Sequence, residues 1–377
     1  MYYVAYYTLP DDQRKSSPAA NAKIPVIAKV LADAIGTKVE ILSTCSVAKD
    51  NVKGFLRGRR FSVDENVECL QFSTYATKKG WLRRLLFWRA NIKLFFKLLT
   101  VKKQDTVCFY HAIERIPVIL LAKKIKKFKL VLEVEEIYSN ASKLNKKEIE
   151  NEQKIFKIAD AYIFSTEMLN LEINQLNKPY SIIYGTYKVE EQISAKFNDG
   201  KIHCVYAGTF DRLKGGAICA VSAAEYLDEN YHIHIIGFGN EEDKKCLIDK
   251  IESISKKTKC TITFDGLKTG SEYVKFMQTC HIGLSTQNPD AAFNATSFPS
   301  KVLSYMANGL RVVSIKIAVL EISLVNDLLY YYNKNTANAI ACAIKSIDVT
   351  TPYDSRKRIV ELYEKFKKDI KSLSEKI

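Results

Sequence analysis

Short runs rich in β-branched and aromatic residues alternate with amphipathic helical runs along most of this 377-residue chain, and this alternation constrains the fold more than any other feature. Neighbouring parallel strands need a long crossover connection, which a helix normally supplies. The alternation therefore predicts βαβ units and parallel sheets with helices on both faces. In the first half, strands are predicted at residues 2–9, 38–43, 68–73, 106–110, 130–134, 161–165 and 181–184, and helices at 21–35, 80–103, 116–127 and 146–159. In the second half, strands are predicted at 202–206, 232–236, 261–264, 282–284 and 311–314, and helices at 217–227, 241–254, 271–278, 301–308 and 336–347.

A polar segment at residues 187–200 separates the two series, because it carries several charges and no apolar period. It divides the chain into a first domain at residues 1–190 and a second at 191–353, a division that the chain length allows. Residues 354–377 are predicted to form a charged helix that packs back towards the first domain. The expected fold class is α/β, with two Rossmann-like, doubly wound parallel-sheet domains facing across a cleft. In such sheets, ligands bind beyond the carboxyl ends of the strands.

Cysteine usage and hydropathy indicate the cytoplasm. The nine cysteines are odd in number and form no close pair, which favours buried reduced thiols over a disulfide framework or a zinc site. The first nine residues are typical of a strand rather than a signal peptide. No apolar run approaches the roughly 20 residues that a membrane-spanning helix needs.

The net charge of +15 is concentrated in one part of the chain. Residues 76–130 contain fifteen Lys and Arg against two acidic residues, a net charge of +13. Within them, residues 80–103 place Trp81, Trp88 and other apolar side chains at helical spacing, with Lys and Arg between them. This composition is typical of a helix that lies on an anionic membrane surface. The alternative is a core helix with a solvated basic face. Nucleic acid is not an expected partner, since no recognised nucleic-acid motif accompanies the basic residues.

Two glycine-containing turns follow predicted strands of the second half, where phosphate and nucleotide sites belong. In VYAGTFDRLKGG, residues 205–216, Gly208 allows a ligand to approach the strand end, and Arg212 and Lys214 can meet a diphosphate at the start of a helix. In IIGFGNE, residues 235–241, Gly237 and Gly239 make a tight strand-to-helix turn, which alone is weak evidence for a nucleotide site.

The third segment, SFPSKVLSYMANGLRVV at residues 297–313, predicts a helix followed by a strand. Ser297 is the expected N-cap, and Pro299 suits the first turn. Lys301 would also lie in the first turn, where a cation opposes the helix dipole. A bound diphosphate would compensate for this, whereas a solvated lysine is the alternative.

Together, the order and spacing of the three segments resemble glycosyltransferase family four and its neighbours with the GT-B fold, in the bacterial surface-polysaccharide branch with a Phe-Pro-Ser-Lys motif. The resemblance implies retaining, metal-independent transfer of a sugar from a UDP or GDP donor, without a cofactor. It implies an acceptor that is a polyprenyl-diphosphate-linked glycan for capsule, O-antigen or exopolysaccharide, used at the inner face of the cell membrane. No Asp-x-Asp motif is present, in agreement with metal independence. The implied diphosphate ligands are Gly208, Arg212, Lys214, Ser297, Ser300 and Lys301, and the implied base and ribose ligands are Gly237, Gly239 and Ser304.

The chain departs from the family at two glutamates that stand eight positions apart around this helix. Aligned on LSYMA, they fall on Thr296 and Ser304. The Ser304 hydroxyl can bond a ribose hydroxyl, and Asp290 is a candidate carboxylate. The departure leaves the donor sugar unassigned.

Candidate catalytic residues of the first half follow predicted strands. His111 closes the strand at 106–110 and is expected to point into the interdomain cleft. Glu133 and Glu135 lie on one side of the next strand, and Glu136 lies on the other. Glu135 or Glu136 could orient an acceptor hydroxyl or act as a base. The alternative is pairing with the basic segment.

Two rival functions stay open. The first is a sugar-nucleotide epimerase of similar fold, which would not need the basic helix. The second is a catalytically inactive glycan-binding or scaffold subunit, which the absent glutamates keep open.

Overall fold

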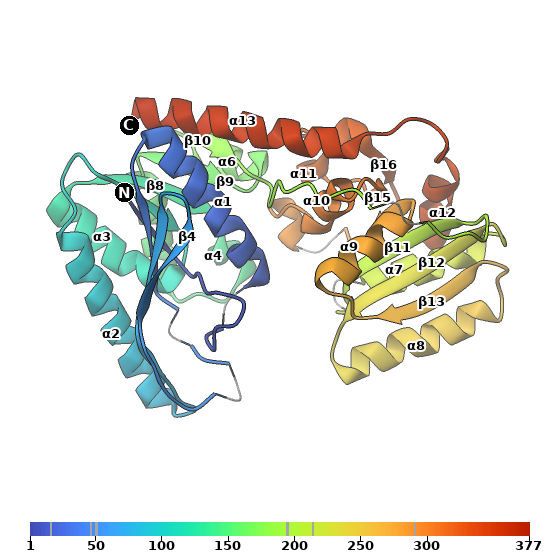
Figure 1. Ribbon diagram of the computed structural model, residues 1–377, viewed down its shortest axis with the longest axis horizontal. Helices are drawn as coiled ribbons and strands as arrows, with labels where there is room; N and C mark the ends of the chain where they lie inside the picture. Colours follow the sequence, from blue (N-terminus) through green and yellow to red (C-terminus); the bar gives the residue numbers. More distant parts are fainter. Residues whose placement is uncertain (16, 46, 50–51, 194–195, 213–214, 290–291) are drawn as a thin grey trace. The chain divides into compact units, whose positions relative to one another are not determined.

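The computed structural model describes residues 1–15, 17–45, 47–49, 52–193, 196–212, 215–289 and 292–377 (Figure 1). The chain divides into two compact units. One comprises Met1–Thr186 together with Lys365–Ile377, and the other comprises Tyr187–Glu364. The predicted α/β class, with largely parallel sheets in Rossmann-like units, is confirmed.

The first unit contains an eight-stranded sheet in the described part of the chain, in the order β10-β9-β8-β7-β1-β2-β5-β4. All neighbours are parallel except β4 and β5. The strands are β1 (Tyr2–Ala5), β2 (Val39–Ser43), β4 (Arg59–Asp64), β5 (Val67–Gln71), β7 (Thr106–Tyr110), β8 (Lys129–Val134), β9 (Ala161–Phe164) and β10 (Tyr180–Ile182). A separate antiparallel pair joins β3 (Gly54–Leu56) to β6 (Thr74–Ala76).

Helices cover both faces of this sheet, and local signals set their ends. The first helix begins after Ser17, whose side chain accepts a hydrogen bond from the Ala20 amide, and it ends at Gly36, which adopts a left-handed conformation with φ 63°. Asn145 and Glu148 form a capping box at the start of the fifth helix. The helices of this unit are α1 (Pro18–Ile35), α2 (Gly80–Leu99), α3 (Ile116–Lys126), α4 (Tyr138–Ala141), α5 (Lys146–Ile158) and α6 (Glu167–Ile173).

The second unit contains a six-stranded parallel sheet among its described residues, in the order β13-β12-β11-β14-β15-β16. Its strands are β11 (Ile202–Thr209), β12 (Tyr231–Phe238), β13 (Thr261–Gly266), β14 (Ile282–Ser285), β15 (Arg311–Ile315) and β16 (Leu329–Tyr332). Its helices are α7 (Gly216–Ala223), α8 (Glu241–Ser255), α9 (Gly270–Thr279), α10 (Ser300–Ala307), α11 (Ala318–Glu321) and α12 (Ala337–Lys345). The final helix, α13 (Ser355–Lys376), contributes residues to both units.

Sequence patterns missed four strands, namely β3, β4, β6 and β16. The β4 strand is an antiparallel edge strand with exposed Arg59 and Arg60, so it lacks the apolar run of a buried parallel strand. Within the described residues, no helix combines the length and apolar character needed to span a bilayer.

Candidate functional site

The carboxyl ends of β11 and β12 meet at a pair of glycines. Gly208 and Gly237 are register partners in the parallel ladder. A Cβ atom on Gly237 would lie 1.8 Å from the Gly208 carbonyl oxygen, and the Gly237 φ of 139° is itself unfavourable for other residues. Gly239 is similarly confined, since its Cβ would lie 2.9 Å from Phe210 Cβ. At the predicted glycine turns, the carboxyl ends of β11 and β12 therefore carry no side chains at Gly208, Gly237 and Gly239.

The helix that follows β11 starts at the same end of the sheet. Gly215, the N-cap of α7, has φ 66°, and a Cβ atom on Gly216 would lie 2.5 Å from the Thr286 carbonyl oxygen. Thr286 also donates its hydroxyl to the Gly216 carbonyl oxygen at 2.7 Å. These contacts hold the α7 N-terminus close to the end of β14, so its first amides lie at the carboxyl edge of the sheet.

Lys301 lies in the first turn of α10, as predicted, and reaches the same edge. Its Nζ atom lies 4.1 Å from the centre of the Tyr206 ring. It also lies 3.5 Å from the position that a Cβ atom on Gly208 would occupy. The structure thus brings Lys301 and Gly208 together from segments more than ninety residues apart.

The N-cap of α10 differs from the sequence prediction. Pro299, not Ser297, is the N-cap of α10, and Ser300 is its first helical residue, because the helix starts later than the capping pattern indicated. Arg212 donates hydrogen bonds to the carboxylates of Asp243 and Glu242, at 2.6 Å each, which raise the pKa of Arg212. Lys214 and Asp290 lie outside the described residues.

Tyr305 fixes α10 against the sheet, a role that the sequence analysis missed. Its hydroxyl accepts a hydrogen bond from the Ala207 amide at 2.9 Å and donates one to the Leu284 carbonyl oxygen at 3.2 Å. A Cβ atom on Gly283 would lie 2.3 Å from the ring, so the ring fills the place of a side chain there. Two sequence features could have indicated this role: an aromatic residue four positions after Lys301, and a glycine in the strand before that helix.

Ser304, predicted to bind ribose, contacts a tyrosine of α9. The hydroxyls of Ser304 and Tyr273 lie 2.9 Å apart.

In the first unit, the acidic residues at the end of β8 bind a lysine of α1. Glu133 is fully buried and accepts a hydrogen bond from the Tyr3 hydroxyl. Lys23 Nζ lies 3.8 Å from Glu133 Oε1 and also pairs with Glu135. Burial raises the pKa of Glu133. The predicted shared side of Glu133 and Glu135 is confirmed. The alternative, pairing with the basic segment, is wrong for both, because their partner lies on α1.

His111 follows β7, as predicted, but its side chain is buried with 2% exposure. Its ring lies between Tyr138 and Phe156, with centroid distances of 5.3 and 5.1 Å. His111 Nε2 is 3.5 Å from Glu152 Oε1. Burial lowers the pKa of His111 to about 4, so the ring is neutral near pH 7. Glu136 is partly buried. Catalytic roles for His111, Glu135 and Glu136 stay predictions.

No protein-family model matches the chain, and no curated protein matches its sequence. Solved structures match its architecture. OtsA in its apo form is 12% identical, with a TM-score of 0.63, over 99% of this chain and 97% of that chain. The α,α-trehalose 6-phosphate synthase of Burkholderia multivorans is 11% identical, with a TM-score of 0.62, over 99% and 94%. HepE of Anabaena, in complex with UDP and glucose, is 12% identical, with a TM-score of 0.61, over 100% and 97%. These matches show that the chain has the GT-B fold.

Proposed function

We propose that this protein is a glycosyltransferase that transfers a sugar from a nucleotide-sugar donor of the UDP or GDP type. The observation that carries the proposal is the position of Lys301 Nζ beside Gly208, at the bare carboxyl end of β11. A lysine ammonium, a glycine at a strand end and a helix N-terminus lie at one edge of the sheet, and together these groups can bind a diphosphate. The solved structures of similar fold include UDP-forming α,α-trehalose-phosphate synthase and HepE with UDP.

In the proposed reaction, the bond between the sugar and the nucleotide diphosphate breaks, the sugar forms a bond to an acceptor hydroxyl oxygen that gives up its proton, and the departing diphosphate takes up negative charge. The Lys301 ammonium and the first amides of α7 would stabilise that charge, and their preorganised positions make the stabilisation effective. The same groups would perform this task without a metal at the donor site. Retention of configuration is part of the proposal. Among the proteins of similar fold, trehalose-6-phosphate synthase is one whose glycosyl transfer proceeds with retention.

The exposed face of α2 supports the proposed membrane-linked acceptor. Trp81 and Trp88 are 67% and 64% exposed, whereas Ala90, Leu94 and Leu98 are buried on the opposite side of the helix. Further exposed apolar residues continue the stripe, namely Leu85, Ile92 and Phe96. Because Lys and Arg flank this stripe, anionic lipid complements it in both charge and polarity. We infer that the protein works at the inner face of the cell membrane on a polyprenyl-diphosphate-linked glycan of capsule, O-antigen or exopolysaccharide synthesis.

Donor turnover by the purified full chain tests the proposal. UDP- and GDP-sugars are first screened for a thermal shift, because a ligand that binds the folded state must stabilise it. Release of nucleotide diphosphate is then measured for the wild type, for Lys301→Ala and for the control Lys345→Ala, which removes an exposed lysine of α12. We expect Lys301→Ala to lose roughly 100-fold or more in turnover, as does the loss of one preorganised donor to a developing anion. The control should retain wild-type turnover.

Equal turnover in the Lys301→Ala variant and the wild type would refute the donor site. A donor that stabilises the wild type but is never turned over, with or without acceptor, would identify the inactive glycan-binding subunit instead. Ser304 in place of a glutamate is the feature that favours this second function. Epimerised donor without transfer would identify the epimerase.

A further inference from the structure

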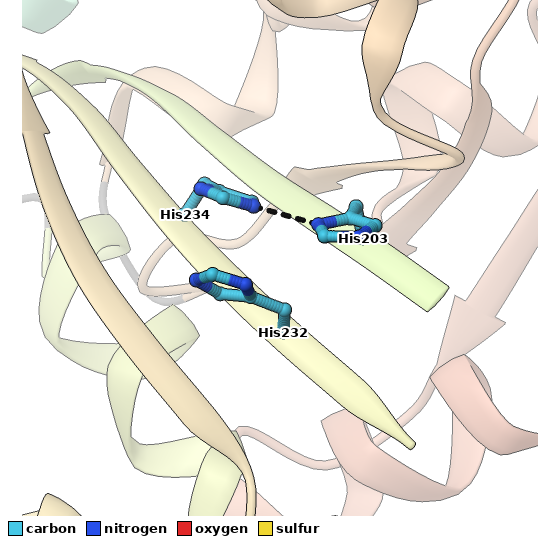
Figure 2. Close-up of side chains that lie close together, drawn as sticks. All are labelled: His203, His232 and His234. Atoms are coloured by element: carbon cyan, nitrogen blue, oxygen red, sulfur yellow. Dashed lines mark hydrogen bonds between the residues drawn. The ribbon is translucent and has the colours of Figure 1, made fainter. Parts of the chain in front are cut away.

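Three histidines gather at the amino-terminal ends of β11 and β12, at the opposite end of the strands from Gly208 and Gly237 (Figure 2). His203 and His232 are register partners, and His234 follows two residues later on the same face. One nitrogen from each ring lies within 4.8 Å of the others. The cluster is therefore separate from the proposed donor site.

A nitrogen of the His203 ring points at a nitrogen of the His234 ring, as the dashed line in Figure 2 shows. His203 Nδ1 and His234 Nε2 are 2.9 Å apart. Each ring's outer nitrogen meets a carboxylate. His203 Nε2 lies 2.9 Å from Asp199 Oδ1, and His234 Nδ1 lies 2.9 Å from Asp265 Oδ2. The order is thus carboxylate, imidazole, imidazole, carboxylate.

Two neutral rings cannot satisfy this chain of contacts. Its three contacts need three protons, whereas two neutral imidazoles carry only two. If each outer nitrogen donates to its carboxylate, the two inner lone pairs point at each other. His203 and His234 are 1% and 2% exposed, so water has little access to relieve that opposition.

Either a proton on one ring or a divalent cation between the inner nitrogens resolves the conflict, and the third imidazole, His232, favours the cation. Each ring would keep one proton on its outer nitrogen and donate it to a carboxylate, which is the arrangement that commonly orients metal-bound histidines. The charge also balances, because the carboxylates of Asp199 and Asp265 together offset a 2+ ion. The inner nitrogens need to separate from 2.9 Å to about 3.3 Å for tetrahedral Zn–N bonds of about 2.0–2.1 Å.

His232 supplies the third imidazole. Its ring stacks on His234 with a centroid distance of 3.9 Å, and its Nε2 lies 3.0 Å from Thr263 Oγ1. Phe197 stacks on His203 at 3.9 Å, and Phe276 stands edge-on to His234 at 5.2 Å. Aromatic rings thus surround a set of nitrogen ligands that suits Zn²⁺ and its neighbours among the transition metals.

We propose that His203, His232 and His234 bind one divalent transition-metal ion of the Zn²⁺ type, oriented by Asp199 and Asp265. Cysteine spacing and the absence of an Asp-x-Asp motif predicted no metal, but neither feature bears on histidines that adjacent strands bring together. Sugar transfer at the other end of the sheet stays metal-independent under this proposal. The proposal does not depend on the proposed function.

Metal titration of the tag-free, chelator-treated full chain tests it. We expect one Zn²⁺ per chain by calorimetry, and Co²⁺ should give the visible absorption of a tetrahedral, nitrogen-rich site. Asp265→Asn keeps all three ligands but removes one orienting carboxylate, so we expect affinity to fall about 10- to 100-fold. His232→Gln should weaken binding at least as much. The control His281→Gln replaces a neighbouring histidine whose Nδ1 accepts a hydrogen bond from the His203 amide, and it should bind like the wild type.

Circular dichroism establishes that each variant is folded, and Asp265→Asn provides the result if a ligand variant unfolds. Absence of a stoichiometric Co²⁺ spectrum in the wild type overturns the proposal. Unchanged affinity in both Asp265→Asn and His232→Gln overturns it as well. A loss of affinity in His281→Gln that exceeds the loss in His232→Gln would do the same, because His281 and not His232 would then be the third ligand.

Discussion

Substitution of Gly237 by alanine adds only one methyl group, but it should strongly destabilise the second unit. The new Cβ atom would lie 1.8 Å from the Gly208 carbonyl oxygen, so β11 and β12 must separate by about 1.2 Å to reach even the closest tolerated contact of 3.0 Å. Overpacking of this kind costs about 1–3 kcal/mol. The backbone conformation at φ 139° adds a penalty of about 1–3 kcal/mol for a residue with a Cβ atom. We expect a total loss of about 4 kcal/mol.

Gly266→Ala is the matched control. Gly266 also ends a strand of the same sheet and also has a positive φ, 74°, but its Cβ would meet no atom within 4 Å. Only the left-handed conformation is penalised there, by about 1–2 kcal/mol. Since 1 kcal/mol shifts the Tm of a domain of this size by about 2–4 °C, we expect a Tm loss of about 12 °C for Gly237→Ala and about 4 °C for the control.

Differential scanning calorimetry of the full chain measures both losses. Hydrogen exchange of the β11 and β12 amides then locates them, because a chain of two units need not unfold in a single transition. We expect faster exchange at Phe210, whose amide donates to the Phe238 carbonyl oxygen at 2.9 Å. Equal Tm losses in Gly237→Ala and Gly266→Ala would refute the close approach of the two strands.

Three further predictions concern other parts of the molecule. Lys23→Met leaves the ionised Glu133 buried without its cation, and we expect a loss of about 3–5 kcal/mol in urea unfolding near pH 9, above the Glu133 pKa of about 8. Burial raises the folded-state pKa of Glu133 above its unfolded value, so the carboxyl group favours folding only at low pH, and the deficit should shrink as pH falls from about 8 to about 5; a deficit independent of pH would contradict this. Tyr305→Phe removes both hydrogen bonds of a buried hydroxyl and should cost about 1–3 kcal/mol in the same assay, with Tyr330→Phe as a partly exposed control that costs little. Replacement of Trp81 and Trp88 by serine should abolish flotation with anionic liposomes. As a control, serine in place of the exposed Phe238 and Leu267 of the second unit should leave flotation unchanged. Unchanged flotation of the tryptophan variant would exclude α2 as the membrane contact.

The sequence was informative where a single segment determines its own structure. The predicted strand at residues 106–110 and the starts of the helices at residues 80, 146 and 241 match the structure, because apolar period and capping residues act locally. Lys301 could be placed in the first turn of its helix on the same basis. The β4 strand was missed because, as an exposed antiparallel edge strand, it has too few apolar residues to show a period.

Contacts between distant segments could not be read from the sequence in this way. Lys23 on α1 lies more than a hundred residues before Glu133, and the sequence suggested only the basic segment as an alternative partner. His111 illustrates the same limit, since its place after a strand was predictable but its burial by Tyr138 and Phe156 was not. The register that pairs His203 with His232 is likewise a property of the folded sheet.

The two proposed sites of the second unit lie at opposite ends of the same pair of strands. At the carboxyl end, β11 and β12 approach so closely that Gly237 has no room for a Cβ atom beside Gly208. At the amino end, a metal ion bound by His203, His232 and His234 would link the same two strands. The two ends are about 16 Å apart, because His232 and Gly237 are separated by five residues at about 3.3 Å per residue. A bound ion would raise the stability of the whole unit by mass action, but it would not relieve a collision at the far end. Zn²⁺ should therefore raise the Tm of the wild type and of Gly237→Ala by similar amounts, so that the difference between them persists.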